Sequence, residues 1–200
     1  MRIIGGDLRG RRLVDWEESG IRPMRDFVRT AMFNILIDFI PGARFLDLFA
    51  GTGSIGLEAL SRGAASCTFV DRTVEACAII RRNLDHLNLL DRAEVVQADA
   101  MDAAARFARR ARTYDVVFLG PPYYNELAPR ALEALASGRA LSEDPVVVAE
   151  IHETEQLQDA YGCLEQVDHR KYGDNQLFFY RRAEIGQETD SGHGGGFDDG

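Results

Sequence analysis

Residues 45–56 read Phe-Leu-Asp-Leu-Phe-Ala-Gly-Thr-Gly-Ser-Ile-Gly. An apolar run leads into glycines spaced as G-x-G-x-x-G, and a helical pattern over residues 54–62 follows. A strand, a glycine turn and a helix in this order are typical of Rossmann-like folds that bind adenosine-containing ligands. Asp71 ends the next predicted strand, where a carboxylate can accept hydrogen bonds from a ribose diol. The stretch therefore predicts an α/β fold with a nucleotide-type cofactor.

The rest of the chain repeats this alternation of strands and helices. Apolar runs predict seven strands, at residues 45–49, 66–70, 93–97, 114–119, 146–149, 167–172 and 176–180. Helical patterns lie at residues 54–62 and 74–87, after residue 97, and at 127–136. Repeated strand–helix units predict a mostly parallel sheet covered on both faces. The turn signal Gly173-Asp174-Asn175 predicts that the last two strands form an antiparallel hairpin.

Three segments of different character divide the chain. Residues 1–42 form a basic extension, predicted as a short hairpin around Gly5-Gly6-Asp7 and a helix that ends at Pro41-Gly42. Residues 43–182 carry the strand–helix units of the main domain. Residues 183–200 are acidic and rich in glycine, and we predict that this tail is disordered because it cannot bury a core.

Composition excludes several classes of protein. Hydrophobic residues make up 46% of the 200 residues and charged residues 28%, which excludes collagen, a coiled coil and a mostly disordered chain. No apolar run has the roughly 20 residues of a membrane span, and the N-terminus lacks the apolar core of a signal peptide. The three cysteines form no C-x-x-C pair and the four histidines are scattered, so we expect no metal site. We expect a cytoplasmic monomer with no membrane partner.

Charge is distributed unevenly. The net charge is −9, yet the first thirty residues carry seven arginines against five acidic residues. An acidic chain can still bind nucleic acid through a local basic region. Candidates for phosphate contacts are Arg2, Arg9, Arg11, Arg12, Arg22, Arg25 and Arg29. The alternative is that these arginines form an ordinary solvated face.

The glycine turn alone does not distinguish NAD from S-adenosylmethionine, but its surroundings favour the latter. Asp47 precedes the turn, where a carboxylate repels a pyrophosphate and suits a cationic methyl donor. Asp99 follows the third strand, on the expected adenine side. The predicted cofactor-binding residues are Asp47, Phe49, Gly51, Gly53, Asp71 and Asp99. For Asp71 and Asp99 the alternative role is that of a helix N-cap.

A second motif, Gly120-Pro121-Pro122-Tyr123, follows the fourth predicted strand. It places carbonyl groups at the carboxyl edge of the sheet, where ligands bind in open α/β folds. Those carbonyls can accept hydrogen bonds from an exocyclic amino group, and Tyr123 can stack on a base. These four residues are the predicted catalytic site, and an ordinary proline loop is the alternative.

The two motifs together resemble the class I S-adenosylmethionine-dependent methyltransferases that modify exocyclic amines of bases. The N-terminal residues narrow the resemblance to bacterial 16S rRNA guanine-N2 methyltransferases of the RsmD type. The residues that carry this narrower resemblance are Met1-Arg-Ile-Ile-Gly-Gly, Arg9-Gly-Arg-Arg-Leu, Arg22-Pro23, Val28-Arg29, Phe33-Asn-Ile-Leu and Tyr172-Gly-Asp. The resemblance implies S-adenosylmethionine as cofactor and 16S rRNA or the small ribosomal subunit as partner.

One residue departs from the family pattern. The motif usually begins with Asp, Asn or Ser, and this chain has Gly120 there, with Asn125 nearby as a candidate replacement. Alternatives are therefore an amine methyltransferase for a protein or small molecule, and an impaired homologue that binds RNA. An NAD-dependent oxidoreductase fits least, because 200 residues leave little room for a substrate domain.

Overall fold

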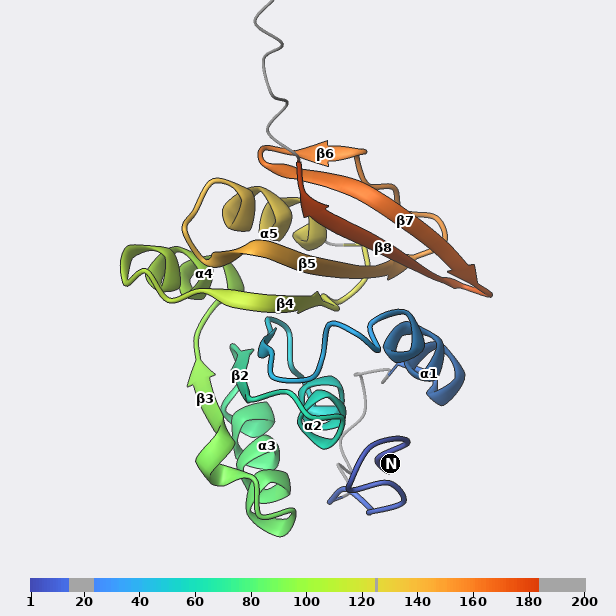
Figure 1. The fold of residues 1–200 in the computed structure, drawn as a ribbon, viewed down its shortest axis with the longest axis vertical. Helices are drawn as coiled ribbons and strands as arrows, with labels where there is room; N and C mark the ends of the chain where they lie inside the picture. Colours follow the sequence, from blue (N-terminus) through green and yellow to red (C-terminus); the bar gives the residue numbers. More distant parts are fainter. Residues whose placement is uncertain (15–23, 125, 184–200) are drawn as a thin grey trace, which may run out of the picture.

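A computed structural model of the protein describes residues 1–14, 24–124 and 126–183. Its centre is one eight-stranded sheet in the order β3-β2-β1-β4-β5-β8-β7-β6 (Figure 1). The strands are β1 (Arg44–Asp47), β2 (Ser66–Asp71), β3 (Ala93–Gln97), β4 (Tyr114–Leu119), β5 (Leu141–His152), β6 (Ala160–Tyr161), β7 (Leu164–Tyr172) and β8 (Asn175–Arg182). Strands β1 to β5 pair in parallel, and β8, β7 and β6 continue the sheet in antiparallel pairs.

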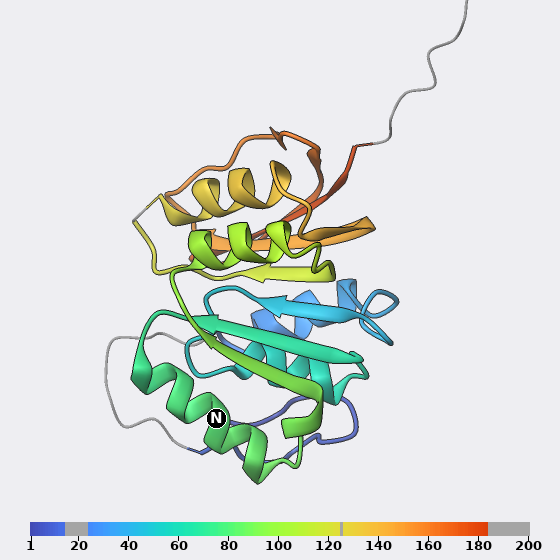
Figure 2. The same ribbon diagram turned by 90° about the vertical axis from the view of Figure 1, so that its left-hand side faces the viewer.

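Helices cover both faces of this sheet (Figures 1 and 2). One face carries α1 (Asp26–Ile35), α2 (Ser54–Ser61) and α3 (Val74–His86), and the other carries α4 (Ala100–Arg109) and α5 (Leu127–Ala136). A short 3-10 helix, η1 (Leu90–Arg92), leads into β3. Side chains alternate between the two faces along each strand, so each face of the sheet packs in its own apolar core.

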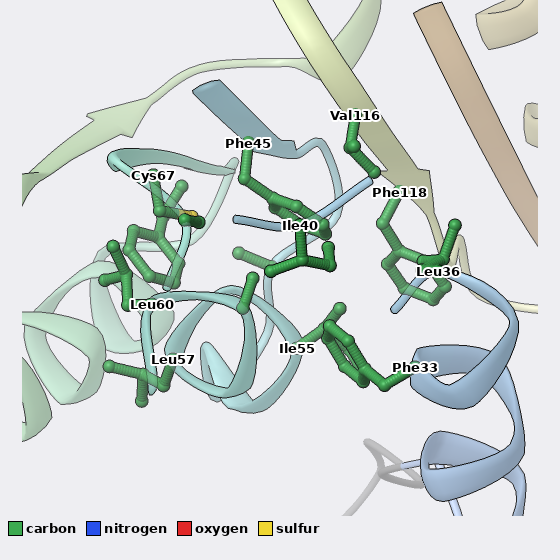
Figure 3. Close-up of a cluster of buried hydrophobic side chains, with 14 of the residues drawn as sticks. Phe33, Leu36, Ile40, Phe45, Ile55, Leu57, Leu60, Cys67, Val116 and Phe118 are labelled. Atoms are coloured by element: carbon green, nitrogen blue, oxygen red, sulfur yellow. The ribbon is translucent and has the colours of Figure 1, made fainter. Parts of the chain in front are cut away.

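The N-terminal extension shares one of these cores with the main domain. Figure 3 shows Phe33 and Leu36, from α1 and the residue after it, packing beside Phe118 of β4 and Ile55 of α2. Phe33, Leu36 and Phe118 are all almost completely buried. Residues 1–42 differ from the rest in sequence character, yet the described parts of this segment, 1–14 and 24–42, fold onto the same core.

The first fourteen residues attach to α2 through their backbone. A single antiparallel bridge joins Arg2 to Arg12 where the sequence predicts a hairpin. The N–H groups of Ile4 and Gly5 donate to the Glu58 carboxylate at 2.8 and 2.7 Å. The N–H group of Leu8 donates to Ser61 Oγ at 3.0 Å. The Glu58 side chain is fully buried at this contact.

The predicted strand and helix order is confirmed, with differences of extent. The helix α1 ends at Ile35, before the predicted end at Pro41-Gly42, and β7 begins at Leu164 rather than at residue 167. The two-residue edge strand β6 adds an eighth strand. Strand β5 runs from Leu141 to His152 and is longer at both ends than the predicted strand at residues 146–149. Asn175, predicted as part of the turn, opens β8 and pairs with Tyr172. The predicted disordered tail lies outside the described residues apart from Ala183. Among the helices that the structure describes, none is long and apolar enough to cross a membrane.

Candidate active site

A pocket of about 390 Å³ opens at the carboxyl ends of β1, β2, β3 and β4. The strand order reverses between β1 and β4, which is where open α/β sheets form a ligand crevice. The loops that follow these strands supply most of the wall. The lining residues are Leu48, Phe49, Gly51, Asp71, Arg72, Thr73, Ala98, Asp99, Ala100, Gly120, Pro121, Pro122, Tyr123 and Leu127. Both sequence motifs thus face the same cavity.

The glycine turn forms the first wall of this pocket. Gly51 lines it, and Gly53 is the N-cap of α2 with a left-handed φ of 78°. The N–H of Gly51 donates to Asp71 Oδ2 at 2.9 Å, which ties the turn to the end of β2. Phe49 also lines the cavity, whereas Gly53 does not. The turn therefore forms part of the pocket wall, and cofactor binding by its glycines stays a prediction.

Two acidic residues, Asp71 and Asp99, also line the pocket. Asp71 Oδ1 accepts hydrogen bonds from the backbone N–H and the hydroxyl of Thr73, each at 2.9 Å. Asp99 is the N-cap of α4 and accepts a bond from the Met101 N–H at 2.9 Å. Each carboxylate oxygen has two lone pairs, so capping and ligand binding are compatible. Asp99 thus has the alternative role, that of a helix N-cap, and it also lines the pocket; its contact with a cofactor stays a prediction.

Asp47 lies beneath the pocket, and its side chain is not part of the lining. It is 1% exposed, and Oδ2 accepts a hydrogen bond from the Gly56 N–H at 3.1 Å. Oδ1 is buried and has no hydrogen-bond partner among the described residues. Burial raises the pKa of Asp47 to about 7, while the bond from Gly56 opposes the rise. Cofactor binding by Asp47 stays a prediction.

The second motif forms the opposite wall, since all four residues from Gly120 to Tyr123 line the pocket. The Tyr123 hydroxyl donates to Glu150 Oε1 at 3.3 Å and accepts from Asn175 Nδ2 at 2.6 Å. Asn175 Nδ2 also lies 2.6 Å from Glu150 Oε1. The candidate replacement Asn125 lies outside the described residues.

Glu150 and Asn175 are not among the lining residues, but both bind the Tyr123 hydroxyl behind the pocket wall, and the sequence analysis missed them. Glu150 is the single acidic residue within the buried run of β5 from Pro145 to Ile151, and such a residue in a buried strand is a signal that can be read from sequence. Asn175 gives no such signal, because its neighbours Gly173 and Asp174 make it look like part of a turn. Its place in β8 follows from the pairing with β5 and β7.

The predicted RNA-binding arginines have different outcomes. The exposed ones are Arg2, Arg9, Arg11, Arg12 and Arg25, while Arg22 lies outside the described residues. The prediction for Arg29 is wrong: its side chain is 1% exposed and donates to the Arg2 carbonyl at 2.8 Å and to Asp26 at 3.1 Å. It also lies 4.0 Å from buried Glu58. Arg29 lies on the same face of α1 as buried apolar residues, so its side chain points into the protein and is not available for RNA.

Comparisons with known proteins agree with this architecture. Residues 1–181 match the family described as Conserved hypothetical protein 95. A Bacillus subtilis protein provisionally named rRNA methyltransferase YlbH is 35% identical over 91% of this chain and 99% of its own length. The Escherichia coli ribosomal RNA small subunit methyltransferase D is 35% identical over 75% of this chain and 74% of its own.

A solved structure extends the agreement to three dimensions. The structure of the Escherichia coli protein yhhF, provisionally named a methyltransferase, has a TM-score of 0.80 and 30% identity over 91% of this chain and 97% of its own. The matches cover both the basic extension and the main domain. The chain therefore belongs to the Conserved hypothetical protein 95 family, together with relatives named ribosomal RNA small subunit methyltransferase D.

Proposed function

We propose that this protein transfers a methyl group from S-adenosylmethionine to the exocyclic N2 amine of a guanine in 16S rRNA of the small ribosomal subunit. One observation carries the proposal. A single pocket has the glycine turn with Asp71 and Asp99 on one wall and Gly120 to Tyr123 on the other. The relatives named for small-subunit rRNA methylation support the substrate class.

The acidic wall suits the cofactor. Asp71, held by Gly51 and Thr73, offers fixed oxygens to a ribose diol. Asp99, also in the pocket wall, would face the adenine, and Asp47 beneath the turn would favour a cationic ligand when ionised. The bound cofactor would supply an electrophilic methyl group on a sulfonium, a good leaving group. The chemistry then needs alignment of the acceptor rather than a metal or a covalent intermediate.

The proline wall suits the acceptor. Guanine N2 is a weak nucleophile because its lone pair is delocalised into the ring. Backbone carbonyls at Gly120 and Pro121 would accept its hydrogens, and Tyr123 would stack on the base. Holding the amine about 3–3.5 Å from the methyl carbon, in line with the bond that breaks, supplies the rate enhancement. A guanine in folded RNA reaches this pocket once it is splayed out of its stack.

The basic extension would hold the RNA. Exposed Arg2, Arg9, Arg11 and Arg12 lie on the fourteen-residue segment anchored to α2, the helix that begins at the glycine turn. Phosphate contacts position a nucleic acid without reading its sequence. The arginine side chains would therefore orient the RNA while the pocket selects the base.

Nucleoside mass spectrometry of 16S rRNA tests the proposal. Ribosomes from cells that lack this gene should have lost one N2-methylguanosine, and the purified protein with labelled S-adenosylmethionine should restore it on their small subunits. Transfer to N2 of guanine supports the proposal. Methylation of a protein component, or of another base, would contradict the substrate; binding of the subunit without any transfer would identify an impaired RNA-binding homologue.

A further inference from the structure

A buried carboxylate stands directly behind the proline wall. Glu150 lies on β5, next to β4, and the whole residue is 6% exposed. Its Oε2 atom is 3.6 Å from the point where a Cβ on Gly120 would stand. Gly120 itself lines the pocket and offers no side chain toward a ligand. The same point lies 2.7 Å from Cε1 of Phe118, so a phenyl ring and a carboxylate oxygen together border Gly120 on this side.

The two oxygens of this carboxylate differ in their surroundings. Oε1 lies 2.6 Å from the Asn175 amide nitrogen and 3.3 Å from the Tyr123 hydroxyl, and both groups donate to it. Oε2 accepts no hydrogen bond from the part of the chain that the structure describes. Two donors on one oxygen fix the orientation of the group. The other oxygen keeps its lone pairs for a further donor.

We infer that Glu150 is a catalytic residue that accepts a hydrogen bond, through Oε2, from the exocyclic amine that is methylated. The inference rests on the proposed function and names a further residue for it. An amine with two hydrogens needs two acceptors to be held in one orientation, and backbone carbonyls of the proline wall provide the other. The acceptor that Gly120 cannot offer then comes from the neighbouring strand.

Glu150 can also take the proton that the reaction releases. The nitrogen lone pair forms the new bond to the methyl carbon, and the carbon–sulfur bond breaks with its electron pair going to sulfur. The methylated nitrogen carries an excess proton, which passes to the Glu150 carboxylate and from there to water. Burial raises the pKa of Glu150 to about 7, and the bonds from Tyr123 and Asn175 oppose this rise. A base with a pKa near neutrality suits this role.

Few titratable groups among the described residues lie near Glu150. Tyr123 faces it from the loop after β4, and burial raises the pKa of this phenol, so the hydroxyl stays protonated. On β8 its partner is the uncharged Asn175. His152 contacts the Tyr123 ring, and Glu155 bonds the backbone N–H groups of Tyr124 and His152. The apolar residue next to Gly120 is Phe118, whose buried ring packs on the side of the sheet that α1 covers.

Single-turnover methyl transfer to unmethylated small subunits tests the inference. With the wild type, the rate should rise with pH and level off above about 7. Glu150→Gln should lower the rate about 100-fold and remove this pH dependence, while affinity for S-adenosylmethionine by calorimetry stays the same. Glu153→Gln is the matched control: this exposed carboxylate lies three residues away, pairs with Lys171 and should leave the rate within twofold.

Two results would overturn the inference alone: an active wild type whose rate is flat from pH 5.5 to 8.5, or a Glu150→Gln variant with the wild-type rate and profile. If Glu150→Gln does not fold, Glu150→Asp serves instead. It keeps the charge and withdraws the oxygen by one methylene, so the rate should fall about tenfold with the pH dependence retained; an unchanged rate would overturn the inference. A wild type that binds S-adenosylmethionine yet methylates no guanine would overturn the proposed function itself.

Discussion

Gly51 and Asp71 are joined by a 2.9 Å hydrogen bond between the backbone N–H of the glycine turn and the carboxylate at the end of β2. The bond crosses from β1 to its neighbour at the edge where the pocket opens. Asp71 therefore shapes the turn as well as facing the cavity. A substitution there should affect cofactor binding twice, through the lost acceptor and through the loosened turn.

Asp71→Ala should weaken S-adenosylmethionine binding by about 1.5–3 kcal/mol, the scale of a hydrogen bond to a charged group. Isothermal titration calorimetry measures this directly. Glu75→Ala, an exposed acidic residue in the first turn of α3, is the control and should leave affinity unchanged. Equal affinities for the Asp71 variant and the wild type would remove Asp71 from the cofactor site.

Asp47→Asn should change stability in a pH-dependent way. The pKa of Asp47 is raised by burial from 3.8 to about 7, so its favourable contribution is complete below about pH 4 and is lost as pH rises through 7. Asparagine does not titrate. Relative to the wild type, the variant should gain about 2–4 kcal/mol between pH 4 and pH 8. Urea denaturation at both pH values checks this, and a constant difference would contradict the buried charge.

The same variant should bind the cofactor less well. If Asp47 contributes negative charge beneath the turn, removing it weakens attraction to a cationic ligand. The expected result is a protein that is more stable at pH 8 without ligand and weaker in S-adenosylmethionine affinity. Unchanged affinity in a stabilised variant would show that Asp47 has no part in binding.

Replacing Arg9, Arg11 and Arg12 with alanine should weaken RNA binding and leave S-adenosylmethionine affinity intact. Each lost phosphate contact should reduce the slope of log affinity against log salt by about 0.7–0.9. Filter binding to small subunits over a range of salt concentrations gives that slope. The control replaces Arg109 and Arg110, exposed arginines at the end of α4, and should leave the slope unchanged. Equal slopes in both variants would refute the assignment.

Arg29→Met and Arg25→Met should differ in their effect on the free energy of unfolding, because the first removes a buried cation and the second an exposed one. Arg29 is 1% exposed and lies beside buried Glu58. Because Glu58 keeps Arg62 as a partner at 2.8 Å, Arg29→Met should lower the free energy of unfolding by about 2–3 kcal/mol. Arg25 pairs with Asp174 where both side chains are more than half exposed, and its loss should cost less than about 1 kcal/mol. Chemical denaturation measures both, and equal costs would contradict the buried role.

Gly120→Asp should lower activity on its own. A Cβ at this position would stand 2.7 Å from the Cε1 atom of Phe118, too close for a buried ring that packs against α1. Phe118→Leu replaces the ring with a smaller side chain and makes room for the added carboxylate. The double variant should therefore recover the transfer rate relative to Gly120→Asp alone. Full activity of the single variant would show that Phe118 moves freely.

Local patterns in the sequence predict which residues form the pocket wall. The turn at Gly51, the carboxylate of Asp71 and the proline loop each depend on residues a few positions apart, and the structure brings them to one pocket. Arg29 is different, because its burial depends on the helical face that it shares with Met32 and Phe33. Counting charge alone places it on the surface, whereas reading the helix periodicity places it inside.

The Glu150 group shows where prediction from sequence fails. Tyr123, Glu150 and Asn175 come from a loop and two strands, and they meet because β5 pairs with β4 on one side and β8 on the other. The register of an antiparallel pair decides which residue faces Glu150, and a slip of one residue would turn Asn175 to the other face. No local pattern fixes that register, so contacts of this kind become visible only in the folded chain.

The N-terminal segment is attached to α2 by backbone groups, and not by the side chains that it exposes. Glu58 and Ser61 hold it through the backbone N–H groups of Ile4, Gly5 and Leu8, which every residue except proline possesses. The arginine side chains on the segment take no part in those three bonds. Substitutions of the outward-facing side chains can therefore change what this surface binds, while the three backbone bonds keep the segment attached to α2.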